Sequence, residues 1–171
     1  LVSLPDFDPT IPSEAAEKDR LNRVSGGVFE MGSTIKTFTT AMALELGNAK
    51  LTTIYDASRP LVIGSQVIHD SHSRGKPLSL VDVFLQSSNI GSAREALAVG
   101  MENHKAFLER AGLLSKIAFE LPEVATPVSP RVWRQVNSLT SAFGHGFATT
   151  PLQTAVGIAA IMNHGRLVPP T

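Results

Sequence analysis

A strong helical pattern begins directly after Glu30-Met31-Gly32. Four apolar residues recur there at intervals of three, four and four, which places them on one face of a helix. These residues are Ile35, Phe38, Met42 and Leu46. Gly47-Asn48 then supplies a stop signal. The sequence therefore predicts a helix that packs this one face against a core.

Other elements are indicated along the rest of the chain. Residues 61–68 form two β-branched runs around Gly64-Ser65, a pattern typical of a small hairpin. Ser79 is a good cap for a helix that ends near Ser87, and two more helices are predicted at about 91–100 and 103–111. A short polar helix is predicted around 13–21, and mostly loop over the Pro- and Gly-containing residues 115–150.

The last predicted helix has a clear start. Thr150 is suited to the N-cap position, Pro151 to the first helical position and Gln153 to the third. The expected buried face is Leu152, Val156 and Ala159. Together these patterns predict a chain that is mostly helical, with little strand.

Composition excludes several classes of protein. The 15 Lys and Arg residues balance 15 Asp and Glu residues, and a formal net charge of zero gives no support to a nucleic-acid binder. With 43% hydrophobic and 18% charged residues, intrinsic disorder is not expected. There is no cysteine, so a disulfide scaffold, a thiolate metal site and a cysteine nucleophile are excluded.

Both ends of the chain have the character of cut ends. Residues 1–5 resemble the tail of a strand, and residues 168–171 follow the last helix without a further element. The length of 171 residues is that of about one domain. The longest nearly apolar stretch, 155–162, is far shorter than the roughly 18–20 residues of a helical membrane crossing. We therefore expect a fragment of a longer protein, all of it one partial domain over 1–171.

Ser33-Thr34-Ile35-Lys36 at the head of the first helix is a candidate catalytic motif. Serine is a weak nucleophile without an adjacent base, and positions three apart on a helix are neighbours, so Lys36 can reach the Ser33 hydroxyl. A helix N-terminus also presents backbone N–H groups to a developing oxyanion. A partly desolvated lysine can lose its proton and act as a base. The alternative is a purely structural role, in which Ser33 caps the helix and Lys36 is solvated.

Ser87-Ser88-Asn89 is the second candidate motif. A hydroxyl and a carboxamide two residues apart on a turn can face one cleft, where the hydroxyl would relay a proton and the amide would orient a peptide. Ser-x-x-Lys followed by a Ser-x-Asn triplet belongs to the motif set of serine β-lactamases and penicillin-binding proteins. The alternative is a helix exit followed by a new N-cap, for which Ser and Asn are also well suited.

The sequence around these motifs resembles that of class B penicillin-binding proteins, and in particular that of the division-specific peptidoglycan D,D-transpeptidases of alphaproteobacteria. The resemblance is carried by 4–9, by the nucleophile segment 29–39, by 87–91, and by Gly144-His145-Gly146 with 150–153. It implies the α+β fold of penicillin-binding proteins and serine β-lactamases, a five-stranded sheet flanked by helices. This chain would hold mainly its helical part.

The resemblance also implies residue roles. Ser33 would be the acylated nucleophile, Lys36 its general base, Ser87 the proton relay and Asn89 a contact to the substrate's backbone. The backbone N–H of Ser33 would form half of an oxyanion hole, and no metal or organic cofactor would be needed.

The family's third motif, Lys-Ser/Thr-Gly, is absent from the 171 residues. None of the six lysines is followed by Ser/Thr-Gly. In the family this motif lies on an edge strand that binds the substrate carboxylate and supplies the other oxyanion donor, after a Pro-Pro-Thr like that of 169–171. We therefore expect the strand beyond this fragment, and expect the fragment alone to be inactive or very slow.

The implied activity is cross-linking of peptidoglycan stem peptides that end in D-Ala-D-Ala, with β-lactams as covalent inhibitors. The implied location is the periplasmic face of the bacterial inner membrane, with an anchor outside this fragment and membrane proteins of the division machinery as partners. Two alternatives stay open. One is a D,D-carboxypeptidase or β-lactamase of the same fold, and the other is a non-enzymatic β-lactam sensor or scaffold.

The remaining candidates are weaker. His69-Asp70-Ser71-His72 holds two histidines near a carboxylate but has no third ligand at suitable spacing, so we expect no metal there. His145 and Trp133 are expected to be structural, and Arg131 and Arg134 to be solvated.

Overall fold

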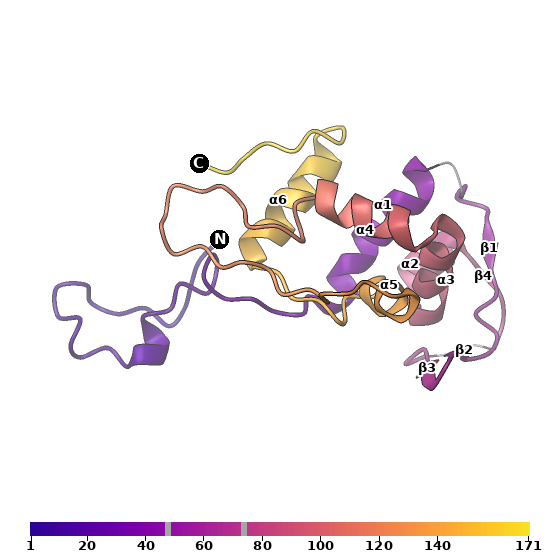
Figure 1. The fold of residues 1–171 in the computed structure, drawn as a ribbon, viewed down its shortest axis with the longest axis horizontal. Helices are drawn as coiled ribbons and strands as arrows, with labels where there is room; N and C mark the ends of the chain where they lie inside the picture. The colour runs from indigo at the N-terminus through magenta and orange to yellow at the C-terminus, as the bar shows by residue number, and fades with distance from the viewer. Residues whose placement is uncertain (47–48, 73–74) are drawn as a thin grey trace.

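The computed structural model describes residues 1–46, 49–72 and 75–171, and most of its regular structure is helical (Figure 1). The helices gather on one side, while the segments before α1 and between α4 and α5 extend away as long loops. The α-helices are α1 Lys36–Glu45, α2 Leu80–Leu85, α3 Asn89–Val99, α4 Met101–Arg110, α5 Gln135–Ser141 and α6 Pro151–Met162. The short elements are the 3-10 helices η1 Glu17–Asp19 and η2 Gly32–Ile35, and the strands β1 Ile54–Tyr55, β2 Leu61–Ile63, β3 Gln66–Ile68 and β4 Leu78–Ser79.

Helix α3 is the centre of the bundle and packs against α1, α2, α4 and α5. Small residues make this possible, because Ala93 and Ala96 are fully buried and let neighbouring backbones approach. Gly91 has the same role toward α2, since a Cβ there would lie 2.4 Å from a methyl group of Val83. The core thus fixes α1 and the start of α3 against each other.

The first predicted helix is confirmed, with one correction. Ile35, Phe38 and Met42 are completely buried, as the spacing predicts. Leu46 is 36% exposed, so its place on the buried face was wrong, because α1 ends at Glu45 and the chain turns away there. The stop signal at Gly47-Asn48 lies outside the described residues.

The hairpin and the capped helices are confirmed. Strands β2 and β3 are antiparallel, with Ile63 opposite Gln66 across the two-residue turn. Ser79 accepts a hydrogen bond from the N–H of Asp82 at the start of α2. Thr150 forms a capping box with Gln153 at the start of α6. Local side-chain chemistry therefore determines where these elements begin.

Three expectations about elements were wrong, and one short helix was not predicted. Residues 1–5 form no strand, and the predicted helix at 13–21 is only the short turn η1. Residues 115–150 are mostly loop, as predicted, but they also contain the short helix α5. Helix α6 buries Leu152, as predicted, but Val156 and Ala159 are not buried. Gly157 and Ala160 are buried in their place, because α6 meets its neighbours through small residues.

Strand content is low, as predicted. Over the described residues the sheets are β1 with β4 and β2 with β3, each two-stranded and antiparallel. In the same residues, no helix has the length and apolar character needed to cross a membrane.

Candidate active site

Ser33 and Lys36 stand where a tight turn becomes a helix. Ser33 lies on η2 and is exposed, and α1 begins at Lys36. The Lys36 side chain is only 3% exposed. The motif therefore presents a hydroxyl at the surface and directs the amine into the interior beneath it.

The Lys36 ammonium donates to residues of the second motif. Its Nζ lies 2.8 Å from Ser87 Oγ and 2.8 Å from Asn89 Oδ1, and it also donates to the backbone carbonyl of Ser87. Ser87 Oγ in turn lies 3.1 Å from Ser33 Oγ. The structure thus brings all four predicted site residues together, and a continuous chain of hydrogen bonds joins Ser33 to Lys36 through Ser87.

Ser87 adopts a backbone conformation that L-residues seldom take. Its φ of 53° is in the left-handed region, which costs a non-glycine residue about 1–2 kcal/mol. The cause is the way α2 ends. The N–H of Ser87 donates to the carbonyl of Phe84, and the N–H of Ser88 donates to that of Val83, the two bonds of a Schellman motif in which glycine is usual.

Asp70 holds the second motif in place from the loop after β3. Its carboxylate accepts from the Ser88 hydroxyl at 2.7 Å and from the N–H of Ile90 at 2.9 Å. Ser88 itself caps α3 by accepting from the N–H of Gly91. Asn89 is fixed from the same side, because its Nδ2 donates to the carbonyl of His69. The helix-cap alternative for Ser88 is therefore confirmed, and it coexists with the cluster around Lys36.

The loop that contains His145 is fixed against the turn that carries Ser33. The N–H of Gly32 donates to the carbonyl of Gly144 at 3.3 Å. A Cβ on Gly144 would lie 2.0 Å from the carbonyl oxygen of Gly32, and the φ of Gly144 is +83°, so only glycine fits. The N–H of Gly146 donates to Glu30 at 2.8 Å. These contacts hold His145 at the rim of the site.

A cavity of about 340 Å³ opens beside the exposed serine. Ser33, Ser87 and Asn89 line it, together with His72 and His145. Lys36 is not in its wall and lies beneath these residues. An extended substrate in this cavity would meet the serine hydroxyls and the Asn89 amide directly.

Burial changes the acid–base properties of Lys36. It lowers the pKa of the amine to about 8, while the charges of Asp70 and Glu95 act in the opposite direction. An amine with this pKa is neutral in about one molecule in ten at pH 7. Lys36 is thus able to accept a proton from a serine and return it through the hydrogen-bonded hydroxyls.

Two polar residues near the site were not found from the sequence. The sequence indicates Asp70 only as a weak metal-ligand candidate, whereas its carboxylate accepts hydrogen bonds from Ser88 and Ile90 at the start of α3. Glu95 is completely buried in α3. A signal existed for Glu95, because α3 is rich in small residues and a helix of that kind is buried on several sides.

The metal-site, tryptophan and arginine candidates add no further site. The described residues contain no group of three or more His, Cys, Asp or Glu side chains able to hold a metal ion. Trp133 packs against the core as expected. Arg131 and Arg134 are exposed.

Comparisons with known proteins match the whole chain. The family model described as "Penicillin binding protein transpeptidase domain" matches residues 1–171. The chain is 39% identical, over its full length, to 29% of the "Probable peptidoglycan D,D-transpeptidase FtsI" of Caulobacter vibrioides (strain NA1000 / CB15N). It is 30% identical, over 96% of its length, to 28% of the "Peptidoglycan D,D-transpeptidase FtsI" of Escherichia coli (strain K12).

A solved structure has the same fold. The apo structure of the TP domain from Burkholderia pseudomallei penicillin-binding protein 3 matches with a TM-score of 0.80 and 29% identity. The match covers 86% of this chain and 45% of that one. The chain therefore spans less than a third of these two curated relatives and less than half of the solved domain.

Proposed function

Because the chain belongs to the penicillin-binding protein transpeptidase domain family, we propose that the longer protein to which it belongs, here called the parent protein, is a serine peptidoglycan D,D-transpeptidase. The fold is the α+β fold of these domains, represented mainly by helices. Residues 1–171 form part of one such domain, and Ser33, Lys36, Ser87 and Asn89 are its catalytic residues within this chain.

The proposed reaction begins with acylation of Ser33. Its Oγ attacks the carbonyl carbon between the two D-Ala residues of a stem peptide and loses its proton, through the Ser87 hydroxyl, to the neutral Lys36 amine. The backbone N–H of Ser33 donates to the oxygen that becomes negatively charged. When the amide bond breaks, the proton passes from Lys36 through the Ser87 hydroxyl to the leaving D-Ala amine.

Deacylation completes the cross-link. The amine of a second stem peptide attacks the Ser33 ester, a new amide forms, and the proton of that amine returns to Ser33 Oγ through Ser87. Asn89 donates its amide N–H to the backbone of the bound peptide. In a β-lactam the broken amide belongs to a ring, so the leaving group stays attached and the acyl-enzyme persists.

The observation that carries this proposal is the hydrogen-bonded path from Ser33 Oγ through Ser87 Oγ to the buried Lys36 amine. Its two links are 3.1 Å and 2.8 Å long. An exposed nucleophile joined to a desolvated base through a hydroxyl is the arrangement that acyl transfer by serine requires. A capped helix with a solvated lysine would leave Lys36 in water.

The family's third motif completes the site in this proposal. A Lys-Ser/Thr-Gly segment of the parent protein, not among these 171 residues, supplies the second oxyanion donor and binds the substrate carboxylate. Loss of one oxyanion donor costs about 10²–10³ in rate. The 171-residue chain alone should therefore label with fluorescent penicillin at least about a hundredfold more slowly than the parent protein, and equal rates would show that the third motif is dispensable.

The proposed setting follows from the relatives and the resemblance. The parent protein is held at the periplasmic face of the inner membrane by an anchor outside these residues, and it works in septal wall synthesis with membrane proteins of the division machinery. This is tested by imaging a fluorescent fusion of the parent protein, which should gather at division sites.

Product analysis tests the reaction itself. The parent protein is incubated with a D-Ala-D-Ala stem peptide and an acceptor amine, and the products are separated by mass. A cross-linked dimer with release of D-Ala supports the transpeptidase, whereas an uncross-linked stem peptide that is shorter by one D-Ala identifies a carboxypeptidase. Covalent penicillin labelling without either product identifies a sensor. Ser33→Ala is the control and should abolish every one of these reactions.

A further inference from the structure

Glu95 is a buried carboxyl group that the proposed reaction does not use. It lies in α3 and has no exposed surface. Its Oε2 accepts a hydrogen bond from Thr40 Oγ1 of α1 at 3.2 Å. Its Oε1 is buried and has no hydrogen-bond partner among the described residues. Burying a carboxyl group with one oxygen unpaired costs free energy of folding. A functional role for Glu95 would explain why this cost is tolerated.

Glu95 shares the α1–α3 interface with the catalytic amine. On α1, Thr40 is one turn beyond Lys36 and therefore on the same face. On α3, Asn89 accepts from Lys36, and Glu95 accepts from Thr40 further along the helix. Two polar contacts thus cross the α1–α3 interface, one from Lys36 to Asn89 and one from Thr40 to Glu95.

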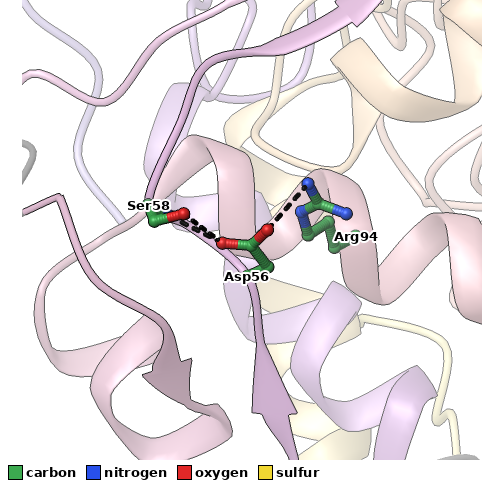
Figure 2. A network of polar contacts seen from close by, with 3 residues as sticks. All are labelled: Asp56, Ser58 and Arg94. Carbon is green, nitrogen blue, oxygen red and sulfur yellow. Dashed lines mark hydrogen bonds and ion pairs between the residues drawn. The ribbon is translucent and has the colours of Figure 1, made fainter.

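The cation next to Glu95 in the sequence is engaged elsewhere. Arg94, next to Glu95, turns toward the surface and pairs with Asp56, whose carboxylate also accepts from Ser58 (Figure 2). Tyr55 of β1 is buried with an unpaired hydroxyl among the described residues. Arg94 is therefore not the cation that neutralises the charge of Glu95.

The helices packed on α3 supply no second partner. Asp82 of α2 bonds to Ser79, and His104 of α4 bonds to Ser138 of α5. Helix α5 has no ionisable residue. The remaining charged pairs of α4 are Lys105 with Glu109 and Arg110 with Glu45, both at the surface. Asp70 faces Lys36 from the loop after β3.

We propose that Glu95 is a positioning residue for Lys36, a buried carboxylate that touches no substrate and stabilises the Lys36 ammonium formed when Ser33 gives up its proton. The inference rests on the proposed function, because it assigns Lys36 the role of base. Burial raises the pKa of Glu95 to about 7, and the charge of Lys36 opposes that rise. Reciprocally, the charge of Glu95 raises the pKa of Lys36.

Glu95→Gln removes the charge and keeps the shape. Without the carboxylate the ammonium is less stable, so the pKa of Lys36 should fall by about one pH unit, the size expected for one charge several ångströms away at a protein-like dielectric. Thr40→Val removes the donor that favours ionised Glu95, and it should lower the pKa of Lys36 in the same direction by less. Glu45→Gln removes a surface carboxylate and should leave it unchanged.

The titration of Lys36 can be read directly in the 171-residue chain. Lysines are labelled with ¹³C at Cε, the Lys36 signal is assigned by its loss in Lys36→Met, and its shift is followed from pH 6 to 11. A midpoint lowered in Glu95→Gln, lowered less in Thr40→Val and unchanged in Glu45→Gln supports the proposal. An unchanged or raised midpoint in Glu95→Gln overturns it, and if that variant does not fold, an unchanged midpoint in Thr40→Val does so.

The pH profile of penicillin acylation in the parent protein separates positioning from mere support of the fold. A positioning role moves the rising limb of the profile to lower pH in Glu95→Gln. A structural role lowers the rate by the same factor at every pH and overturns the proposal. If Ser33 is not acylated at all while the NMR midpoint still moves, the proposed function fails and the Glu95–Lys36 coupling stands.

Discussion

At Ser87 the backbone conformation and the proposed chemistry favour different residues. The left-handed φ favours glycine, yet the hydroxyl is the middle link between Ser33 and Lys36. We expect Ser87→Gly to be more stable than Ser87→Ala by about 1 kcal/mol, because both lose the hydroxyl and only glycine relieves the backbone. Urea unfolding measures this difference.

Labelling by fluorescent penicillin should fall in both Ser87 variants to a similar extent. Proton transfer by a positioned group contributes about 10²–10⁴ in rate, and neither variant has the relay. Wild-type labelling in Ser87→Gly would mean that Lys36 takes the proton from Ser33 without the hydroxyl of Ser87.

The proposed role of Lys36 as a base predicts a pH dependence of acylation. The neutral amine is the reactive form, so acylation of the parent protein should rise with pH and level off above about pH 8, the pKa that burial gives this group. Lys36→Met should lower the plateau by about 10²–10⁴ and remove the rise. A rise that persists in Lys36→Met would assign it to another group.

The clustering of the four proposed site residues could be predicted from the sequence, because each occupies a motif with fixed local spacing. Ser33 and Lys36 are three apart on a helical turn, and Ser87 and Asn89 flank a helix cap. Asp70 and Glu95 could not be assigned in this way. Their roles depend on contacts with Ser88 and Thr40, which are brought close only by tertiary packing.

Among the elements, the loop around His145 is held to η2 by a backbone contact that leaves no room for a side chain. Gly144→Ala would place a Cβ 2.0 Å from the carbonyl oxygen of Gly32, so the turn carrying Ser33 must shift. We expect a loss of stability of about 2–4 kcal/mol, beyond the cost of a positive φ alone, and a strong loss of penicillin labelling.

Gly64→Ala is the matched control for Gly144→Ala. Gly64 has a φ of +57° in the β2–β3 turn and open space around its Cβ position. It should lose only about 1–2 kcal/mol and keep its labelling. Thermal unfolding and labelling of the two variants side by side test this, and equal losses would show that the contact with Gly32 does not position Ser33.

Helices and strands were predicted correctly where turn or cap residues mark their ends. They were not predicted where tertiary packing determines whether the element forms. The hairpin, α2 and α6 begin at turn or cap residues that are visible in the sequence. Helix α5 was missed because it buries Ser138 and Ser141 beside Leu139. Such a sequence has no apolar stripe, and its helix is stabilised by the surface of α3.

For the molecule as a whole, burial of Glu95 makes stability depend on pH. The folded pKa of about 7 is above the ordinary 4.5, so the protonated form contributes stability that is complete below pH 4.5 and is lost as the pH rises through 7. Glu95→Gln has no such loss. Its free energy of unfolding, relative to wild type, should increase by about 1–3 kcal/mol between pH 4.5 and 8.

His104 changes the free energy of unfolding with pH in the opposite direction. Its contribution cancels when wild type and Glu95→Gln are compared. Burial lowers its pKa to about 4, so its contribution is complete above pH 6.5 and is lost as the pH falls through 4. The effect is the same in wild type and in Glu95→Gln. Urea unfolding of both proteins at several pH values gives the difference, and a constant difference would mean that Glu95 ionises as an exposed residue does.

Covalent labelling of Ser33 is the central claim, and locating the adduct tests it most directly. The parent protein is treated with a penicillin, digested, and its peptides are sequenced by mass spectrometry. The expected result is one adduct, on Ser33, that disappears in Ser33→Ala while the fold remains intact. An adduct on another residue, or undiminished labelling of Ser33→Ala, would contradict the assignment of Ser33 as nucleophile.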